Sequence, residues 1–184
     1  MRTQAVIGTL LAALAPVQAA AASPSATRTP PHAPTAVSAP AKPAGRVLAR
    51  ISIPRLKLRH RPIREGVSRR VLARGIGHYP GTAMPGEIGN AVLLGHRTTY
   101  LAPFHDLDRL RRGDRIIVRG GRTTHVFRAY GTRIISPRKA SVLAPVPFRK
   151  GRTPRESVLT LISCHPKGSD RMRIVVIARK DGAP

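Results

Sequence analysis

The segment Val158-Leu-Thr-Leu-Ile-Ser-Cys-His-Pro166 is the most informative part of this 184-residue chain for predicting its fold. Its first six residues are mainly apolar, which is typical of a strand that is buried within a sheet. Cys164, the only cysteine, comes where this strand ends and a polar loop begins. A thiol in that position can meet a substrate, and a single cysteine excludes an internal disulfide framework.

Basic residues follow Cys164 closely in the sequence. Lys167, Arg171 and Arg173 lie within nine positions of it, and cationic neighbours favour the nucleophilic thiolate form of a cysteine. A lone cysteine is often an inert core residue, but the polar and charged residues beside this one are not typical of a core. We therefore interpret Cys164 as a nucleophile, which usually needs an imidazole to exchange its proton.

Of the seven histidines, His96 is the best candidate for that imidazole. It follows the apolar run 91–94 and so is expected at the end of a strand, as Cys164 is. The two side chains could then face each other across the mouth of a barrel. His165 adjoins the cysteine, but neighbouring side chains on an extended chain point to opposite faces. The other histidines are expected in a linker (His32), in strands (His60, His125), in a structural hydrogen bond (His78) and on the surface (His105).

Short apolar segments separated by glycine and proline run from Arg46 almost to the C-terminus. The expected strands are residues 47–53, 56–63, 91–94, 115–119, 125–130, 132–136, 158–163 and 173–179. Only residues 68–74 and 103–111 have short helical character. About eight short strands with little helix predict an all-β domain, either a closed barrel or a sandwich.

The first 45 residues differ from the rest in composition. Residues 1–22 have one early positive charge, an apolar run and then small residues, which is the layout of a signal peptide or an N-terminal membrane anchor. Residues 23–45 are rich in Pro, Ala, Ser and Thr and predict a disordered linker. The folded domain is expected at 46–180, followed by a tail at 181–184. An exported or anchored domain would lie outside the cytoplasm, with residues 5–22 associating with the membrane.

The chain carries 33 Lys and Arg against 8 Asp and Glu, a formal net charge of +25. Such an excess indicates an anionic partner, which could be nucleic acid, an acidic membrane or a cell-wall polymer. Aromatic residues make up only 3% of the chain, so stacking surfaces for nucleic-acid bases are scarce. Together with the export signal, this argues against nucleic acid as the partner.

Three motifs in order resemble those of the sortase family, and more narrowly its class E members from actinobacteria. The first is Gly95-His-Arg-Thr-Thr-Tyr100, which resembles the region of the catalytic histidine. The second, Thr160-Leu-Ile-Ser-Cys-His-Pro166, resembles the T-L-x-T-C motif, with Ser163 where the family usually has Thr. The third, Arg171-Met-Arg-Ile-Val-Val176, resembles the last strand with its catalytic arginine. The resemblance covers residues 46–180.

The resemblance implies a closed sortase-type β-barrel of about eight strands with short helices in the connections. It assigns Cys164 as the nucleophile, His96 as the general acid and base, and Arg173 as the third catalytic residue. Arg173 is preferred to Arg171 because it directly precedes the apolar strand. The motif also suggests that Thr160, Ser163 and His165 help to bind the substrate.

The implied reaction is transpeptidation through a thioacyl-enzyme. A sorting signal of the L-P-x-T-G type, here expected as L-A-x-T-G, would be cleaved between Thr and Gly. Its Thr carbonyl would then be joined to an amine of a peptidoglycan precursor or a pilin. We expect a monomer that needs no cofactor and no metal, since the mid-chain carboxylates are few (Glu65, Glu87, Asp106, Asp108 and Asp114).

Three other interpretations are weaker. A non-catalytic cationic module that binds anionic wall polymers or lipids would not need Cys164 at all. Papain-like peptidases place the cysteine before the histidine, whereas His96 precedes Cys164 by 68 residues. A metal site made of Cys164, His165 and His96 lacks an acidic residue beside either segment.

Overall fold

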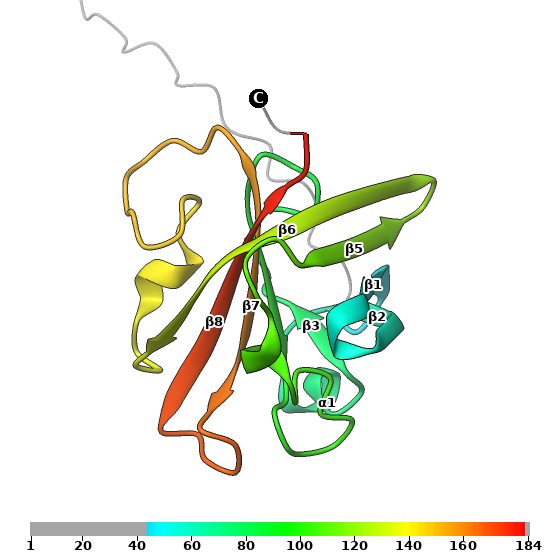
Figure 1. Cartoon of the computed structure of the whole chain (residues 1–184), viewed down its shortest axis with the longest axis vertical. Coiled ribbons are helices and arrows are strands. Elements are labelled where there is room, and N and C mark those ends of the chain that lie inside the picture. The colour runs from blue at the N-terminus through cyan, green and yellow to red at the C-terminus, as the bar shows by residue number, and fades with distance from the viewer. Residues whose placement is uncertain (1–43, 183–184) are drawn as a thin grey trace, which may run out of the picture. The chain divides into compact units, whose positions relative to one another are not determined.

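Eight strands close into a barrel in the order β1-β2-β3-β4-β7-β8-β6-β5 in a computed structural model, which describes residues 44–182 (Figure 1). The strands are β1 (Val47–Ile53), β2 (Leu58–Glu65), β3 (Ile76–His78), β4 (Gly89–Gly95), β5 (Arg115–Gly120), β6 (Thr123–Ile135), β7 (Ser157–His165) and β8 (Met172–Lys180). The connections contain the α-helix α1 (Arg69–Leu72) and the 3₁₀ helices η1 (Pro54–Leu56), η2 (Leu107–Arg109) and η3 (Ala140–Leu143). This architecture confirms the predicted closed barrel with short helices.

The N-terminal predictions fall outside this part of the chain. The signal or anchor at 1–22, the linker up to residue 43 and the last two residues of the tail are not among the described residues. Within residues 44–182, no helix has both the length and the apolar character required to span a bilayer.

Most neighbouring strands are antiparallel, but two pairs are parallel: β2 with β3, and β4 with β7. The register of β4 with β7 pairs Gly89 with Ser157 and Leu94 with Ile162. β7 then pairs with β8 in antiparallel register, and the two lie side by side in Figure 1. Because β4 and β7 are parallel, their C-terminal ends lie at the same end of the barrel, and the start of β8 joins them there.

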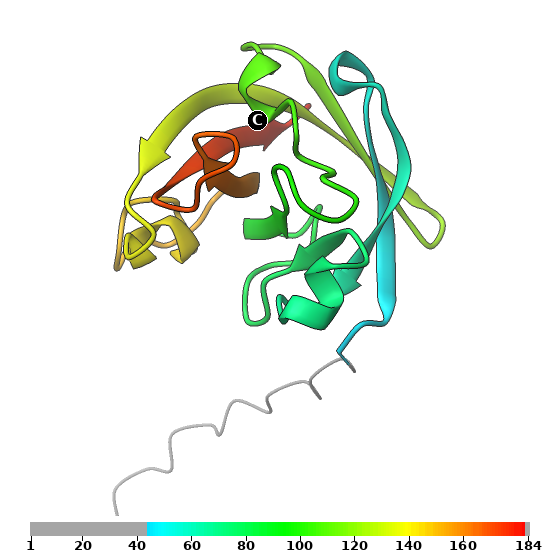
Figure 2. The same cartoon turned by 90° about the horizontal axis from the view of Figure 1, so that it is seen from below.

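The wall formed by β4, β7 and β8 is buried on both faces. Alternate residues point into the barrel core; they include Ala91, Leu93, Leu159, Leu161, Ile174 and Val176. The intervening residues form a second cluster on the outer face with η3: Val92, Ile162 and Val175 pack with Val142. Seen from below, the connection from β6 to β7, coloured yellow to orange, lies outside the ring of strands (Figure 2). A wall that is covered on both faces explains why β4 and β7 have continuous apolar sequences.

The predicted strands match the barrel with two differences. The segments 125–130 and 132–136 belong to one strand, β6, whose register shifts between Ala129 and Gly131. β3 was not predicted, because its three residues lie among glycines that are typical of turns. Gly77 within it has a packing role, since a side-chain Cβ there would lie 2.3 Å from the carbonyl oxygen of Gly66.

The two predicted helical segments contain one turn of helix each. α1 lies within residues 68–74, and the hydroxyl of Ser68 accepts a hydrogen bond from the backbone N–H of Val71. This is an N-cap, which satisfies one of the free N–H groups at a helix start. η2 lies within residues 103–111.

Candidate active site

His96, Cys164 and Arg173 come together at one end of the wall formed by β4, β7 and β8. Cys164 and Arg173 are directly opposite each other in the register of β7 and β8. On the other side of β7, the hydroxyl of Ser163 donates a 2.7 Å hydrogen bond to the carbonyl oxygen of Gly95. This bond continues the alignment of β4 with β7 beyond Leu94, and it places His96 level with Cys164.

These three side chains share the outer face of the barrel wall. In β4 the outward positions are the even-numbered ones, as Val92 shows, and the same holds for Ile162 in β7. Cys164 continues this series, and its cross-strand partner Arg173 therefore lies on the same face. The histidine and the cysteine are neighbours on one wall, and the prediction that they face each other across the barrel mouth was wrong.

His96 is half-buried, and its surroundings favour the neutral imidazole. Burial lowers the pKa of His96 below its ordinary value of 6.5, because desolvation disfavours the charged form. Its Nε2 atom is buried and has no hydrogen-bond partner within the described part of the chain. The ring of Tyr100 packs beside it, with 4.9 Å between ring centroids. A neutral imidazole with a free nitrogen can accept or return a proton.

Close packing before His96 fixes the direction in which the chain leaves β4. A Cβ atom at Gly95 would lie 2.8 Å from Cδ2 of Phe104, so only glycine fits there without displacement. The backbone N–H of Phe104 donates a 3.2 Å hydrogen bond to the carbonyl oxygen of His96. Phe104 itself is completely buried. The barrel core therefore positions the backbone of His96.

Arg173 is half-buried and has a fixed guanidinium group. Its Nη1 atom donates hydrogen bonds to the carbonyl oxygens of Asp170, at 2.7 Å, and of Met172, at 2.9 Å. Both bonds use the same nitrogen, which leaves other N–H donors of this always-charged group for a ligand. Directly opposite residues on antiparallel strands have Cβ atoms about 5 Å apart, so Arg173 can serve a group bound at Cys164.

Arg97 was not predicted as a site residue, although it directly follows His96. It is 2% exposed, and its Nη2 atom forms a 2.8 Å ion pair with Asp108 Oδ1. Its Nε atom donates to the carbonyl oxygen of His105, and its Nη1 atom donates to that of Cys164 at 3.4 Å. One buried guanidinium thus joins the segment after His96 to the residue that carries the thiol. A buried charge of this kind is stable only because it is paired and hydrogen-bonded.

The three residues predicted to bind substrate have different surroundings. Thr160 is completely buried, and its hydroxyl donates a 2.7 Å hydrogen bond to Asn90 Oδ1. Ser163 is also buried, and its hydroxyl donates a hydrogen bond to the carbonyl oxygen of Gly95. Neither hydroxyl faces a substrate, and we correct their role to a structural one. His165 is half-buried, with a buried Nδ1 atom that has no partner among residues 44–182.

Asn90 extends the contact of Thr160 to the connection between β6 and β7. The side-chain amide of Asn90 donates to the carbonyl oxygens of Val142, at 2.9 Å, and Ala144, at 3.0 Å. The three hydrogen bonds anchor η3 to the outer face of the wall. They also explain why two polar side chains occupy a fully buried part of the sheet.

Two further histidines lie in the surroundings expected of them, His78 in a structural hydrogen bond and His105 on the surface. His78 is buried at the end of β3, where Nδ1 lies 3.2 Å from Glu65 Oε2 and Nε2 lies 3.0 Å from the carbonyl oxygen of Ala83. His105 is exposed, with 52% of its side chain accessible. His60 and His125 lie in strands β2 and β6, as predicted; His125 is half-buried, whereas His60 is exposed.

An ion pair ties the loop after Cys164 to the segment after His96. Lys167 Nζ lies 3.0 Å from Asp106 Oδ1. The hydrogen bond from Lys167 is the main cause that lowers the pKa of Asp106 from its ordinary value of 3.8. Together with Arg97, this pair connects the two segments that border the candidate catalytic residues.

The barrel and the residues at this end of its wall define a sortase-type protein, and comparison with known proteins identifies the family. The sortase domain family matches residues 51–181. Sortase SrtE1 of Streptomyces coelicolor is 37% identical over 140 residues, which cover 72% of this chain and 40% of that protein. The chain therefore spans less than half the length of this relative. The chain belongs to the sortase family, and the match to SrtE1 confirms its resemblance to class E.

Solved structures agree with this assignment. The crystal structure of sortase E1 from Streptomyces coelicolor with a tripeptide in the active site has a TM-score of 0.68 and 34% sequence identity. That match covers 74% of this chain and 89% of the other chain. The SrtA sortase from Actinomyces oris has a TM-score of 0.71 and 30% identity, over 79% of this chain and 87% of that one.

Proposed function

We propose that this chain is a cysteine transpeptidase that cleaves the sorting signal of secreted proteins and transfers the product to an amine. The observation that carries the proposal is the meeting of Cys164, His96 and Arg173 on one outer face of the barrel wall. A nucleophile, a proton carrier and a fixed cation within one site are the groups that acyl transfer requires.

The first half-reaction forms a thioester. The Cys164 sulfur attacks the carbonyl carbon of the scissile peptide bond, and His96 takes the thiol proton. Arg173 donates hydrogen bonds to the oxyanion that develops on the carbonyl oxygen. The C–N bond then breaks, and His96 returns the proton to the leaving amine.

The second half-reaction releases the enzyme. An acceptor amine attacks the thioester carbon, His96 takes a proton from that amine, and the C–S bond breaks. The sulfur leaves with its electron pair and regains the proton. The product is a new amide bond, and no net oxidation or reduction occurs.

The resemblance to class E supports a specific substrate. We propose a signal of the L-P-x-T-G type, here L-A-x-T-G, cut between Thr and Gly. The acceptor is an amine of a peptidoglycan precursor or of a pilin. These choices fit a protein exported through residues 1–22 and held away from the membrane by residues 23–45, which places the catalytic domain at 46–180 outside the cytoplasm.

Mass spectrometry of the purified protein with an L-A-x-T-G peptide and triglycine tests the reaction. We expect a product that joins the peptide up to Thr to triglycine, and a thioacyl adduct on Cys164. The Cys164→Ala variant should give neither. An intact peptide, or equal turnover by Cys164→Ala, would overturn the proposal. A non-catalytic cationic module predicts that equality.

A further inference from the structure

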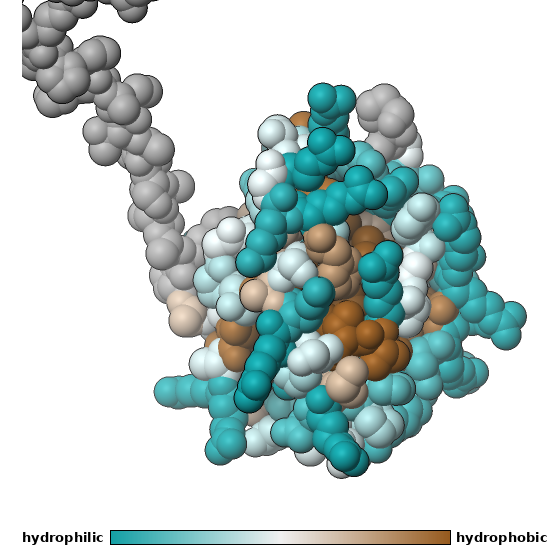
Figure 3. Space-filling view, turned by 90° about the vertical axis from the view of Figure 1, so that its left-hand side faces the viewer, coloured by the Kyte–Doolittle hydropathy of each residue, from teal (hydrophilic) through white to brown (hydrophobic). Residues whose placement is uncertain are grey.

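A concave site lies on the outside of the barrel, away from Cys164. It is a pocket of about 450 Å³ between the outer faces of β6 and β8 and the connection from β6 to β7. Figure 3 shows this side of the molecule, where long hydrophilic side chains surround a hydrophobic patch. The volume lies in the range of small-molecule sites, which is roughly 300–1,000 Å³.

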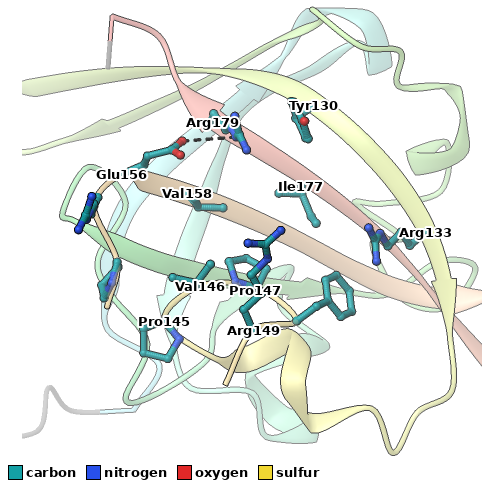
Figure 4. A pocket seen from close by; sticks show the side chains of 13 residues that line it. Tyr130, Arg133, Pro145, Val146, Pro147, Arg149, Glu156, Val158, Ile177 and Arg179 are labelled. Atoms are coloured by element: carbon teal, nitrogen blue, oxygen red, sulfur yellow. Dashed lines mark ion pairs between the residues drawn. The ribbon is translucent and has the colours of Figure 1, made fainter. Parts of the chain in front are cut away.

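Four arginines from two parts of the chain line this pocket. Arg133 and Arg179 come from β6 and β8, and Arg149 and Arg155 come from the connection. Glu156 is the only acidic residue in the lining, and it forms an ion pair with Arg179 at 3.4 Å. Figure 4 shows Arg179, Arg133 and Arg149 around the space, with the ion pair to Glu156 at one edge. The pocket therefore has a net charge of about three positive units, which suits a ligand with several negative charges.

Two of the arginines are held in place by aromatic rings. The guanidinium of Arg179 lies 4.1 Å from the ring centroid of Tyr130, and that of Arg133 lies 4.9 Å from the centroid of Phe148. A guanidinium group has five N–H donors, and the ring face does not occupy any of them as an oxygen acceptor would. Apart from the Nε of Arg179, which pairs with Glu156, these donors can bind oxygen atoms of a ligand. An arginine fixed before binding loses less entropy when the ligand arrives.

The chemistry of these groups favours phosphate. Guanidinium groups bind phosphate through two parallel hydrogen bonds, with both charge and geometry matched. Arg133, Arg149 and Arg155 form no ion pair with any residue that the structure describes. Apolar walls from Val158 and Ile177 lower the local polarity and strengthen attraction to an anion.

The pocket and the candidate catalytic residues share a face but do not overlap. Arg173 and Ile177 both point outward from β8, and they are four positions apart along the strand. At about 3.3 Å per residue, this is a separation of roughly 13 Å. A ligand in the pocket and a peptide at Cys164 could thus be bound together.

We propose that this arginine pocket, lined by Arg133, Arg149, Arg155 and Arg179, binds a ligand that carries two or more phosphate charges. The proposal goes beyond the transpeptidase reaction, which requires no such site. The shared chemistry is the phosphate group, whether it belongs to a soluble phosphorylated compound or to a lipid headgroup. The concave shape favours a discrete compound that inserts into the pocket.

Calorimetric titration with inorganic pyrophosphate at constant ionic strength tests the site. We expect saturable binding with a stoichiometry of one, and binding weaker by about tenfold or more in the double variant Arg149→Gln/Arg155→Gln, because charge-assisted hydrogen bonds are lost. The matched control is Arg115→Gln/Arg122→Gln, which removes the same charge from exposed residues outside the lining. The control should bind as the wild type does. No saturation, or equal loss in both variants, would overturn the proposal.

Two additional measurements separate the remaining outcomes. Sedimentation with phosphatidylcholine vesicles, with and without cardiolipin, whose headgroup carries two phosphate groups, assigns the phosphate to a lipid headgroup if the Arg149/Arg155 variant alone loses binding to the anionic vesicles. If both variants bind the vesicles equally, and only the Arg149/Arg155 variant loses pyrophosphate binding, the phosphate belongs to a soluble compound. Peptide cleavage should be unchanged in both variants, so failure of the phosphate site is distinguishable from failure of the transpeptidase proposal.

Discussion

The arginines near Cys164 and those in the arginine pocket differ in the contacts that hold their guanidinium groups. Near Cys164, Arg97 and Arg173 give hydrogen bonds to backbone carbonyl groups, and Arg97 also pairs with Asp108. In the arginine pocket, Arg133 and Arg179 lie against aromatic rings. Near Cys164 both guanidinium groups are thus held by backbone carbonyl groups. In the pocket, Arg133 forms no ion pair within the described residues, and Arg179 pairs through Nε with Glu156, which leaves its other N–H groups for a ligand.

After the complete loss expected for Cys164→Ala, the largest effect at the catalytic end should come from His96. Replacement by glutamine (His96→Gln) removes the proton carrier while it keeps a polar side chain of similar size. General acid and base catalysis contributes about 10²- to 10⁴-fold, so peptide turnover should fall by about 10³-fold. Turnover measured by chromatography of the cleaved peptide tests this, with His105→Gln, an exposed histidine, as the control. If both variants lost activity equally, His96 would have no special role.

Arg173 and Arg171 provide a sharper comparison, because they are two residues apart and carry the same charge. Arg171 is exposed in the loop before β8, and Arg173 faces Cys164. Removing one oxyanion donor costs about 10²- to 10³-fold in kcat, which is the expected loss for Arg173→Ala. Arg171→Ala should retain nearly full turnover. A larger loss from Arg171→Ala would reverse the assignment of the third catalytic residue.

Arg97 should show a smaller loss of a different kind. Arg97→Met keeps an unbranched apolar stem but removes the bonds to Cys164, His105 and Asp108. We expect kcat to fall about tenfold with KM nearly unchanged, since a misplaced thiol lowers the rate of chemistry more than the binding of substrate. We also expect the free energy of unfolding to fall by about 2 kcal/mol. Steady-state kinetics and urea unfolding measure the two quantities. A change in stability alone would make Arg97 a purely structural residue.

The strands of the wall could be predicted because their burial leaves a clear pattern. β4 and β7 are covered on both faces, so their sequences are apolar without alternation. β3 could not be predicted, since it has only three residues and Gly77 within it resembles a turn residue. The reason for that glycine is the carbonyl of Gly66, which only the folded barrel brings near.

Candidate site residues could be predicted where a residue type carries its own chemistry, although their catalytic roles stay predictions. A lone cysteine and a histidine at strand ends indicated Cys164 and His96 directly. Arg97 gave no such signal, because a surface role is the ordinary expectation for an arginine and its partners are tertiary. The same limitation explains the correction for Thr160 and Ser163, whose hydroxyl groups bond to Asn90 and Gly95 of another strand.

The smallest expected effect is the pH dependence of stability that His96 contributes. Burial lowers the pKa of His96 in the folded state below 6.5, so the unfolded state binds a proton at higher pH than the native state does. Stability therefore rises with pH wherever the unfolded histidine is protonated and the native one is not. The contribution of His96 to the free energy of unfolding is complete well above pH 6.5 and should decrease as the pH falls through 6.5.

Urea unfolding of the wild type and His96→Gln at pH 8 and pH 5 isolates this contribution. The difference in stability between the two proteins should shift in favour of His96→Gln at pH 5, because glutamine has no proton to bind. An identical acid slope in wild type and His96→Gln would mean that the imidazole is as well solvated in the folded protein as in the unfolded chain. In that case desolvation would not distinguish the surroundings of His96 from those of the arginine pocket.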